Sequence, residues 1–256
     1  MIDRGRGRHA YQAIAEDIRG AITRGELRSG DKTPGLREIR EQYNVANATA
    51  QAALQLLKLW GLVEGRPGAG TFVRIRRPVI NVMDSMTVPG PDGTRRTWKE
   101  IAAEHGLLGT QQATGAGAEA VPIEVADAFG IDAGTIVTWR RRLLLLDGQP
   151  VQIATSYYPP HVAEAVPELG RPERLPMMAP ALLARAGWSI TSSQDRVLAR
   201  HPLTDEAETL GLTSADPVVE TLRTCRTGGG EVVDVTVMVT DGARMHMVYV
   251  FGDIHH

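Results

Sequence analysis

Apolar residues recur at helical spacing near the start of the chain. The predicted buried stripe of a first amphipathic helix, over about residues 9–24, consists of Tyr11, Ile14, Ala15, Ile18 and Ile22. Gly25 and Gly30 mark a turn after this helix. The residues before it are basic, so we expect no apolar signal segment there.

Two shorter helices follow, joined by a tight turn. Thr33-Pro34 opens the second helix, because proline is tolerated in a first helical turn. Its inward residues are Ile39 and Tyr43, with Leu36 as a further candidate. Asn44 takes the left-handed turn position, which asparagine accepts better than most residues. A third helix, over about residues 47–60, has a buried stripe of Ala50, Ala53, Leu54 and Leu57.

The opposite face of the third helix carries small and amide side chains, namely Asn47, Ala48, Gln51, Gln55 and Lys58. Alanines allow close approach to base edges, and Asn or Gln can bond adenine through two hydrogen bonds. The pattern favours a helix that reads the major groove of DNA. A solvated face is the alternative, and Asn47 also fits a helix N-cap.

Two short strands, about residues 62–64 and 71–74, enclose the loop GRPGAG after this helix. The arginines around the loop, Arg66, Arg74, Arg76 and Arg77, suit a DNA backbone or minor groove. A nucleotide-binding loop would end in Gly-Lys-Ser/Thr and lead into a helix, so that alternative fails. The whole stretch therefore predicts a winged helix-turn-helix.

The remaining chain alternates strands with short helices. Residues 78–96 are rich in Pro, Gly and Asp and predict a linker between a domain over 1–77 and one over 97–256. Strands are expected at about 112–117, 135–146, 151–158, 189–199, 218–227, 232–240 and 245–251. Helices are expected at about 97–105, 121–129, 178–186 and 205–210. This order predicts an α+β fold with an antiparallel sheet.

Charge divides along the same boundary. Residues 1–78 hold 14 Arg and Lys against 8 Asp and Glu, whereas the remainder holds 14 against 22. The basic part is therefore the one expected to meet a polyanion. A single cysteine, Cys225, excludes an internal disulfide and fits a cytoplasmic protein. No apolar run approaches the length of a membrane span, so no membrane partner is expected.

Residues 11–73 resemble the DNA-binding domain of the GntR family of bacterial regulators. The resemblance rests on motifs such as Tyr11-Gln12-x-Ile14-Ala15, Pro34-x-x-Arg37-Glu38, Tyr43-x-Val45 and Gly68-x-Gly70-Thr71-Phe72-Val73. It implies a double-stranded DNA operator as partner. With the reading face above, the expected DNA-binding residues are Arg37, Asn47, Ala48, Thr49, Gln51, Gln55, Lys58, Arg66, Gly68, Gly70 and Thr71.

Three positions depart from that resemblance. Asn47 and Gln51 stand where the family usually has arginines, and Arg40 replaces a small residue. Two guanine-reading arginines have thus become amides. The hypothesis is an operator with adenines at the positions that Asn47 and Gln51 contact.

The second part resembles the UTRA effector domain of the HutC subfamily, which has the chorismate-lyase shape. The resemblance rests on Arg142 before Asp147-Gly148-x-Pro150-Val151, on Ser156-Tyr157-x-Pro159 and on the closing hairpin Gly230–Asp241. It implies a small-molecule effector near Arg140, Arg142, Tyr157, Met178 and Asp234. Leu144 and Met178 stand where relatives have a pocket Arg and Ser, which favours a more apolar effector. Core packing of the Leu and Met side chains, and a solvated edge for the arginines, are the alternatives.

An enzyme is the competing class, and its signatures are missing from the sequence. The seven histidines show no metal-binding spacing, and no nucleophile elbow is visible, so no metal or cofactor is expected. The predicted function is a repressor that binds a palindromic operator as a homodimer. The reading face and pocket are similar to those of plasmid-transfer repressors of actinomycetes, whose need for a small ligand stays open. A chorismate-lyase-like enzyme fused to a DNA-binding module, or a nonspecific DNA-binding protein, are the alternatives.

Overall fold

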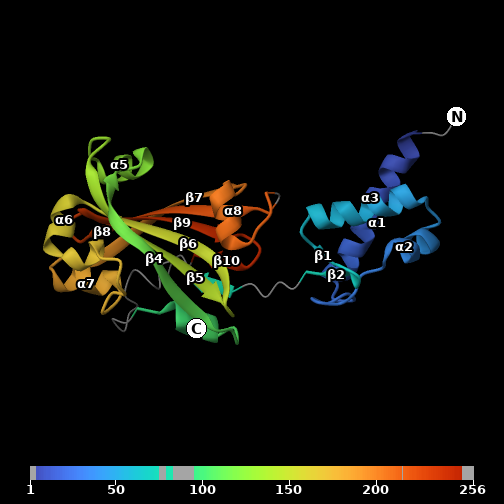
Figure 1. Cartoon of the computed structure of the whole chain (residues 1–256), viewed down its shortest axis with the longest axis horizontal. Helices are drawn as coiled ribbons and strands as arrows, with labels where there is room; N and C mark the ends of the chain where they lie inside the picture. The colour runs from blue at the N-terminus through green and yellow to red at the C-terminus, as the bar shows by residue number, and fades with distance from the viewer. Residues whose placement is uncertain (1–3, 75–78, 83–94, 215, 250–256) are drawn as a thin grey trace. The chain divides into compact units, whose positions relative to one another are not determined.

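The computed structural model describes residues 4–74, 79–82, 95–214 and 216–249 (Figure 1). The chain divides into two compact units, residues 1–77 and residues 78–256. Helices pack with a hairpin in one unit and with a large antiparallel sheet in the other. The predicted α+β class is therefore confirmed.

Three helices and a hairpin form the first unit: α1 (Arg4–Thr23), α2 (Leu36–Tyr43), α3 (Asn47–Leu59), β1 (Val63–Arg66) and β2 (Gly70–Val73). Strands β1 and β2 pair antiparallel around the Gly-rich loop. The core between the helices consists of Ile14, Ala15, Ile18, Ile39, Ala50, Ala53, Leu57 and Val63. The apolar stripes expected of the first and third helices thus pack together, which is how short amphipathic helices gain most of their stability.

The turn between α2 and α3 takes the expected left-handed form at Asn44, with φ 48° and ψ 54°. The Asn44 backbone N–H donates to the Arg40 carbonyl and closes the end of α2. Ile39 is fully buried, but Leu36 is 36% exposed. Leu36, the first residue of α2, is therefore not one of the inward residues of this helix.

A six-stranded antiparallel sheet is the centre of the second unit, in the order β4-β5-β6-β9-β8-β7. Its strands are β4 (Gly109–Ala120), β5 (Ile136–Leu146), β6 (Gln149–Tyr158), β7 (Ile190–Arg200), β8 (Val218–Thr227) and β9 (Val232–Asp241). The middle strands β6, β9 and β8 are buried on both faces. Side chains alternate between two faces along each strand. We call these the Ser156 face and the Tyr157 face, after neighbouring residues of β6.

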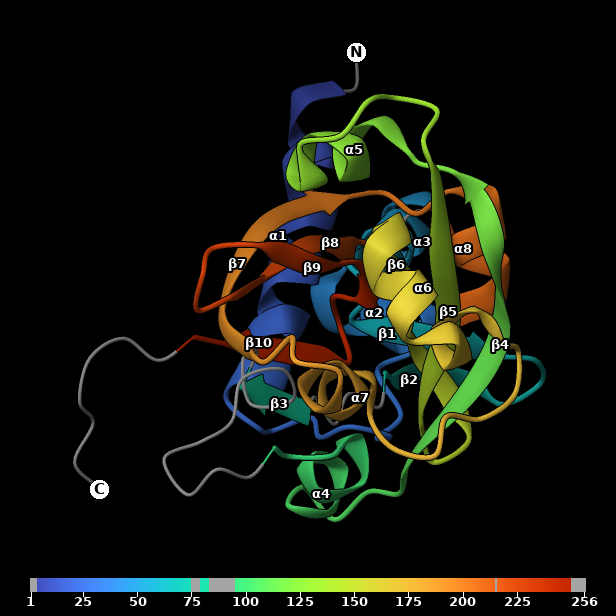
Figure 2. The same ribbon diagram turned by 90° about the vertical axis from the view of Figure 1, so that its left-hand side faces the viewer.

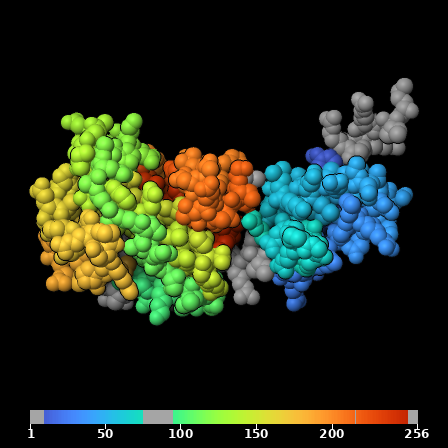
Figure 3. Space-filling view, viewed as in Figure 1, coloured from blue at the N-terminus to red at the C-terminus, as the bar shows by residue number. Residues whose placement is uncertain are grey.

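Helices cover both faces of this sheet (Figures 1 and 2). Helices α5 (Ile123–Phe129) and α8 (Thr204–Leu210) pack on the Tyr157 face, through Val125 and Leu210. Helices α6 (Pro160–Ala165) and α7 (Ala179–Arg185), with the 3-10 turn η1 (Pro167–Gly170), pack against Tyr158 on the Ser156 face. Helix α4 (Trp98–Ala103) packs on Leu144 and Leu146. In the space-filling view α5 and α7 lie on opposite borders of this unit (Figure 3).

Four elements differ from the expectation. Residues 79–82, assigned to the linker, form strand β3 (Val79–Val82), which pairs in parallel with β10 (Met245–Val248). Helix α6 and the turn η1 were not anticipated, because each is too short to show a clear period. Strand β4 is longer than expected. Its Gly and Ala residues are poor strand formers, so the sequence did not predict its full length, but they pair with β5 and cover Trp139.

Leu57→Ala should destabilise the first unit, whereas Leu59→Ala should not. Leu57 has no exposed surface and Leu59 is 63% exposed on the same helix. Loss of a fully buried leucine costs about 2–5 kcal/mol, and an exposed substitution less than about 0.5 kcal/mol. Urea unfolding of the full-length chain measures both. Equal losses would mean that the stripe of α3 is not the core of this unit.

Candidate nucleic-acid interface and buried polar chain

Helix α3 presents the expected polar face to solvent. Asn47, Gln51, Gln55 and Lys58 are all exposed, while Ala50 and Ala53 are fully buried. At about 100° per residue, positions 47, 51, 55 and 58 fall within one quarter of the helix. Ala48 is exposed beside them, but Thr49 is half-buried and lies next to the buried stripe. Thr49 is therefore the one predicted reading residue of α3 that does not lie on this face.

Asn47 is not the N-cap of α3. The cap position is Ala46, with extended backbone and no side-chain cap hydrogen bond. Asn47 is the first helical residue, and its Oδ1 accepts a hydrogen bond of 3.4 Å from Nη1 of Arg40. The capping alternative for Asn47 is thereby removed, and its carboxamide lies at the exposed start of the helix.

The hairpin beside α3 is held in shape by its own side chains. The Arg66 guanidinium lies 4.5 Å from the Phe72 ring centroid and 3.0 Å from Glu64 Oε1. Gly68 and Gly70 have φ values of 71° and 117°, which disfavour any side chain. A Cβ atom at Gly70 would lie 3.0 Å from the Lys32 side chain, so this lysine lies against the hairpin. The loop therefore brings backbone N–H groups and basic side chains together, a combination that suits phosphates.

Thr71 connects the hairpin to the segment before α2. Its side chain is buried, with 9% exposure. Its carbonyl accepts hydrogen bonds from the N–H and the hydroxyl of Thr33, at 2.9 and 3.1 Å. These bonds join the hairpin to the segment before α2, and burial leaves the Thr71 side chain little surface for the predicted DNA contact. The motif Gly68-x-Gly70-Thr71-Phe72-Val73 predicted that Thr71 belongs to the hairpin, but not that its side chain is buried.

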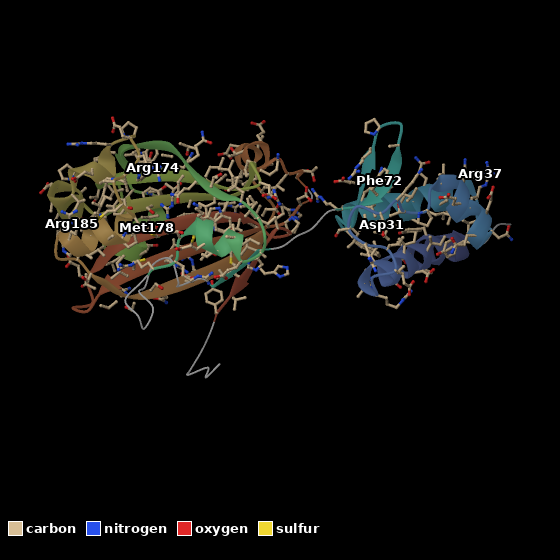
Figure 4. All side chains as sticks on the ribbon, turned by 90° about the horizontal axis from the view of Figure 1, so that it is seen from below. Asp31, Arg37, Phe72, Arg174, Met178 and Arg185 are labelled. Carbon is tan, nitrogen blue, oxygen red and sulfur yellow. The ribbon has the colours of Figure 1, made fainter. Side chains whose placement is uncertain are left out.

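Arg37 projects from α2, well away from Phe72 of the hairpin (Figure 4). Its side chain is 85% exposed, and its Nε lies 2.8 Å from Glu41 Oε1 one turn later. Such an exposed pair contributes little to stability. Arg37 is therefore available to a phosphate, consistent with a positioning contact rather than base reading.

In the second unit, four polar side chains form a continuous chain across three strands. Arg142 Nη1 donates to Ser156 Oγ at 2.9 Å, Ser156 Oγ and Thr236 Oγ1 lie 2.6 Å apart, and Thr236 Oγ1 donates to Asp234 Oδ1 at 2.7 Å. The strand register aligns β5, β6 and β9 so that all four project on the Ser156 face. We call this group the Arg142–Asp234 chain. It brings together two of the five predicted effector residues.

Burial dominates the chemistry at the Asp234 end. Asp234 is 5% exposed, and burial raises the pKa of its carboxyl despite the opposing effects of the Thr236 hydrogen bond and of Arg142. Burial and the charge of Asp234 likewise raise the pKa of the Tyr158 phenol. Burial raises the pKa of the Cys225 thiol well above its ordinary value, so this cysteine is a poor nucleophile.

Arg140 anchors a loop. Its side chain is on the Ser156 face, and its two terminal nitrogens donate to the backbone carbonyls of Arg171 and Glu173. Burial lowers the pKa of Arg140, since neutral carbonyls compensate its charge only in part. The same loop lines a hollow of about 490 Å³ formed by Glu168, Arg171, Glu173, Arg174, Leu175 and Pro176. Arg140 thus shapes the loop beside this hollow.

The other two predicted effector residues lie elsewhere. Tyr157 belongs to the Tyr157 face and packs with Val125 and Val235 under α5. Its neighbour Tyr158, which was not predicted from the sequence, lies on the Ser156 face with the Arg142–Asp234 chain and is fully buried. Tyr157 therefore lies on the opposite face of the sheet from Arg142 and Asp234, because a one-residue step along a strand changes the face.

Met178 is half-buried at the N-cap position of α7. Figure 4 shows it in the second unit near Arg174 and Arg185. Its neighbour Met177 packs against the apolar cluster that contains Tyr158. Met177 therefore supports the core-packing alternative, while Met178 lies at the start of the helix that covers this face.

Within the described residues, no group of three or more His, Cys, Asp or Glu side chains could hold a metal ion. Among the same residues no helix is long and apolar enough to cross a membrane.

Comparison with known proteins matches both units. Residues 111–246 match the UTRA domain, and residues 10–73 match the bacterial regulatory proteins of the gntR family. An uncharacterized HTH-type transcriptional regulator of Streptomyces coelicolor is 28% identical over 252 residues, covering 94% of this chain and 92% of that relative. A crystal structure assigned to the GntR family is 25% identical with a TM-score of 0.66, covering 96% of this chain and 98% of that one. The mannosyl-D-glycerate transport/metabolism system repressor of Escherichia coli is 36% identical over 67 residues, which are 26% of this chain and 28% of that repressor.

Asp234→Asn should stabilise the protein at neutral pH but not in acid. Because burial raises the pKa of Asp234 in the folded state, its contribution to stability is present below the unfolded pKa of about 3.9 and is lost as pH rises through the folded value. Asparagine keeps the acceptor for Thr236 without the charge. The gain in free energy of unfolding, measured with urea, should therefore widen between about pH 4 and about pH 7.

Asp127→Asn is the matched control, because Asp127 is exposed on α5. It should show no such widening. An Asp234→Asn difference that is equal at both pH values would contradict the assignment.

Proposed function

Since this chain belongs to the GntR family of bacterial regulatory proteins and carries a UTRA domain, we propose that it is a repressor released from a palindromic operator by an effector. That it is a DNA-binding transcriptional regulator follows from the family. The observation that carries the proposal is the exposed polar face of α3 beside a basic hairpin. A homodimer would place one such face in each half-site. We place the protein in the cytoplasm, with the nucleoid DNA.

We assign operator reading to Gln51 and Gln55, with phosphate contacts from Lys58, Arg37 and the Gly68–Gly70 loop. Gln51 is exposed near the start of α3, where the residues of a recognition helix meet base edges. A glutamine carboxamide offers one donor and one acceptor, which fits the N7 acceptor and N6 donor of adenine. We therefore propose adenine at the base that Gln51 contacts.

The effector site is assigned to the Ser156 face, between the Arg142–Asp234 chain and the 168–176 loop. Arg142 and Arg140 already hold partners in Ser156 and the loop carbonyls, and Leu175 and Pro176 give the hollow apolar surface. This composition supports a more apolar effector than a sugar phosphate. Membership of the HutC subfamily, and the likeness to plasmid-transfer repressors of actinomycetes, are part of the same proposal and rest on the sequence motifs.

Coupling requires that the effector bind one arrangement of the protein better than the other. We propose that effector binding changes the spacing or mobility of the two hairpins of the dimer through the stretch between the units. Effector and operator would then oppose each other reciprocally.

Two other functions would give different results. A chorismate-lyase-like enzyme would turn over its substrate, whereas a regulator would only lose or gain affinity for DNA when the ligand is added. A nonspecific DNA-binding protein would be displaced by unrelated DNA at physiological salt, because its binding depends on phosphate contacts.

Selection of bound DNA from a random pool by the purified protein should recover a palindromic motif. Half-sites should be about one helical turn apart, or a multiple of it. The recovered motif reports symmetry, spacing and base preference together. A pool that stays random would refute sequence-specific reading, and a motif without symmetry would refute the dimeric operator.

Gln51→Ala and Lys58→Ala should weaken DNA binding in different ways. Gln51→Ala should cost roughly 1–3 kcal/mol on the operator and relax one base pair, because a paired amide is lost. Lys58→Ala should weaken all sequences about equally and reduce the salt slope by about 0.9. Binding titrations on operator and random DNA at several salt concentrations measure both. Equal loss on both DNAs for Gln51→Ala would count against direct reading by that residue.

A further inference from the structure

Arg40 lies at the start of the recognition helix, although it belongs to α2. It is exposed in the last turn of α2, and its guanidinium reaches across the Asn44 turn to Asn47. We propose that Arg40 is a specificity-determining residue, and that the Arg40–Asn47 pair selects guanine at the base where Asn47 alone would select adenine.

The hydrogen bond fixes which way the Asn47 carboxamide turns. A guanidinium has donors only, so the group that it approaches at 3.4 Å must be the amide oxygen, Oδ1. The amide nitrogen, with its two N–H donors, is therefore the end directed away from Arg40. Because the N-cap of α3 is Ala46, no capping bond competes for this carboxamide.

The surface formed by Arg40 and Asn47 therefore presents hydrogen-bond donors to a base. Adenine offers one acceptor and one donor in the major groove, so asparagine reads it with both its oxygen and its nitrogen. Guanine offers two acceptors, N7 and O6, which match the Asn47 N–H₂ group and the Arg40 guanidinium. With Oδ1 turned toward Arg40, the pair is complementary to guanine.

Arg40 keeps its positive charge available for this contact. Its bond to Asn47 is to a neutral amide, whereas Arg37, one turn earlier on α2, forms an ion pair with Glu41. A guanidinium that forms no ion pair with the described residues, at the N-terminal end of a recognition helix, lies where base edges are read. Arg37, 85% exposed, serves as a matched arginine from the same helix.

The inference rests on the proposed contact of α3 with DNA, and one experiment separates the two. Random-pool selection is carried out with the full-length wild type, Arg40→Ala, Asn47→Ala, Gln51→Ala and the double variant Arg40→Ala/Asn47→Ala. The wild type should select guanine at the base pair that Asn47→Ala relaxes. Arg40→Ala should reduce that preference about tenfold or more and shift it toward adenine, because Oδ1 becomes available. The effects of Arg40→Ala and Asn47→Ala should be far from additive in the double variant, since the residues act as one unit.

Two control variants define the outcome. Arg37→Ala should weaken binding to all DNA sequences about equally. Arg24→Ala should leave DNA binding unchanged, because Arg24 is an exposed arginine that pairs with Glu26 after α1. A uniform loss for Arg40→Ala would overturn the proposal and assign Arg40 to a phosphate. Adenine at the Asn47 base pair in the wild type would also overturn it. If the wild type itself recovers no motif, the proposed operator function fails instead. Because Arg40 is exposed, an unchanged unfolding midpoint verifies that the variant is folded.

Discussion

DNA reading depends on the close packing of α3 in the hydrophobic core of the first unit. Ala50 and Ala53 have no exposed surface, and Ile39 of α2 is buried in the same cluster. Small side chains at these two positions let the helices approach closely, and larger ones would cost about 1–3 kcal/mol through overpacking. The packing fixes the rotation of α3 about its axis. The face with Asn47 and Gln51 is exposed because the alanine face is buried.

In the second unit, strand alternation plays the corresponding part. The register of β5, β6 and β9 places Arg142, Ser156 and Thr236 beside one another, so buried polar groups bond to each other instead of to water. An unpaired polar group in this position would cost about 1–3 kcal/mol. The chain ends at Asp234, where the charged form is disfavoured by burial. A buried network of this kind specifies which side chains face the covering helices.

The elements with a clear period could be predicted from the sequence, and so could the face of α3. The Asn44 turn was predicted because few residues accept its backbone geometry. Strand β3 could not be predicted, since its partner β10 is remote in the chain and its own sequence resembles a linker. Which of Tyr157 and Tyr158 shares a face with Arg142 could not be predicted, because β6 is buried on both faces and shows no alternation of apolar and polar residues. The contacts of Thr71 and Arg140 could not be predicted because each involves a backbone carbonyl, which leaves no trace in side-chain patterns. The carbonyl of Thr71 accepts from the Thr33 hydroxyl, and Arg140 donates to the carbonyl of Arg171.

The state of the two strand arginines bears directly on the chemistry of the effector. Arg140 is bonded to the carbonyls of the 171–173 segment, and Arg142 is bonded to Ser156. A ligand with several negative charges would have to displace these internal bonds before it gained bidentate contacts of its own. An apolar ligand with a single hydrogen-bonding group would leave them in place and bury its surface against Leu175 and Pro176 of the hollow. The arrangement of partners, more than the mere presence of arginines, therefore favours an apolar effector.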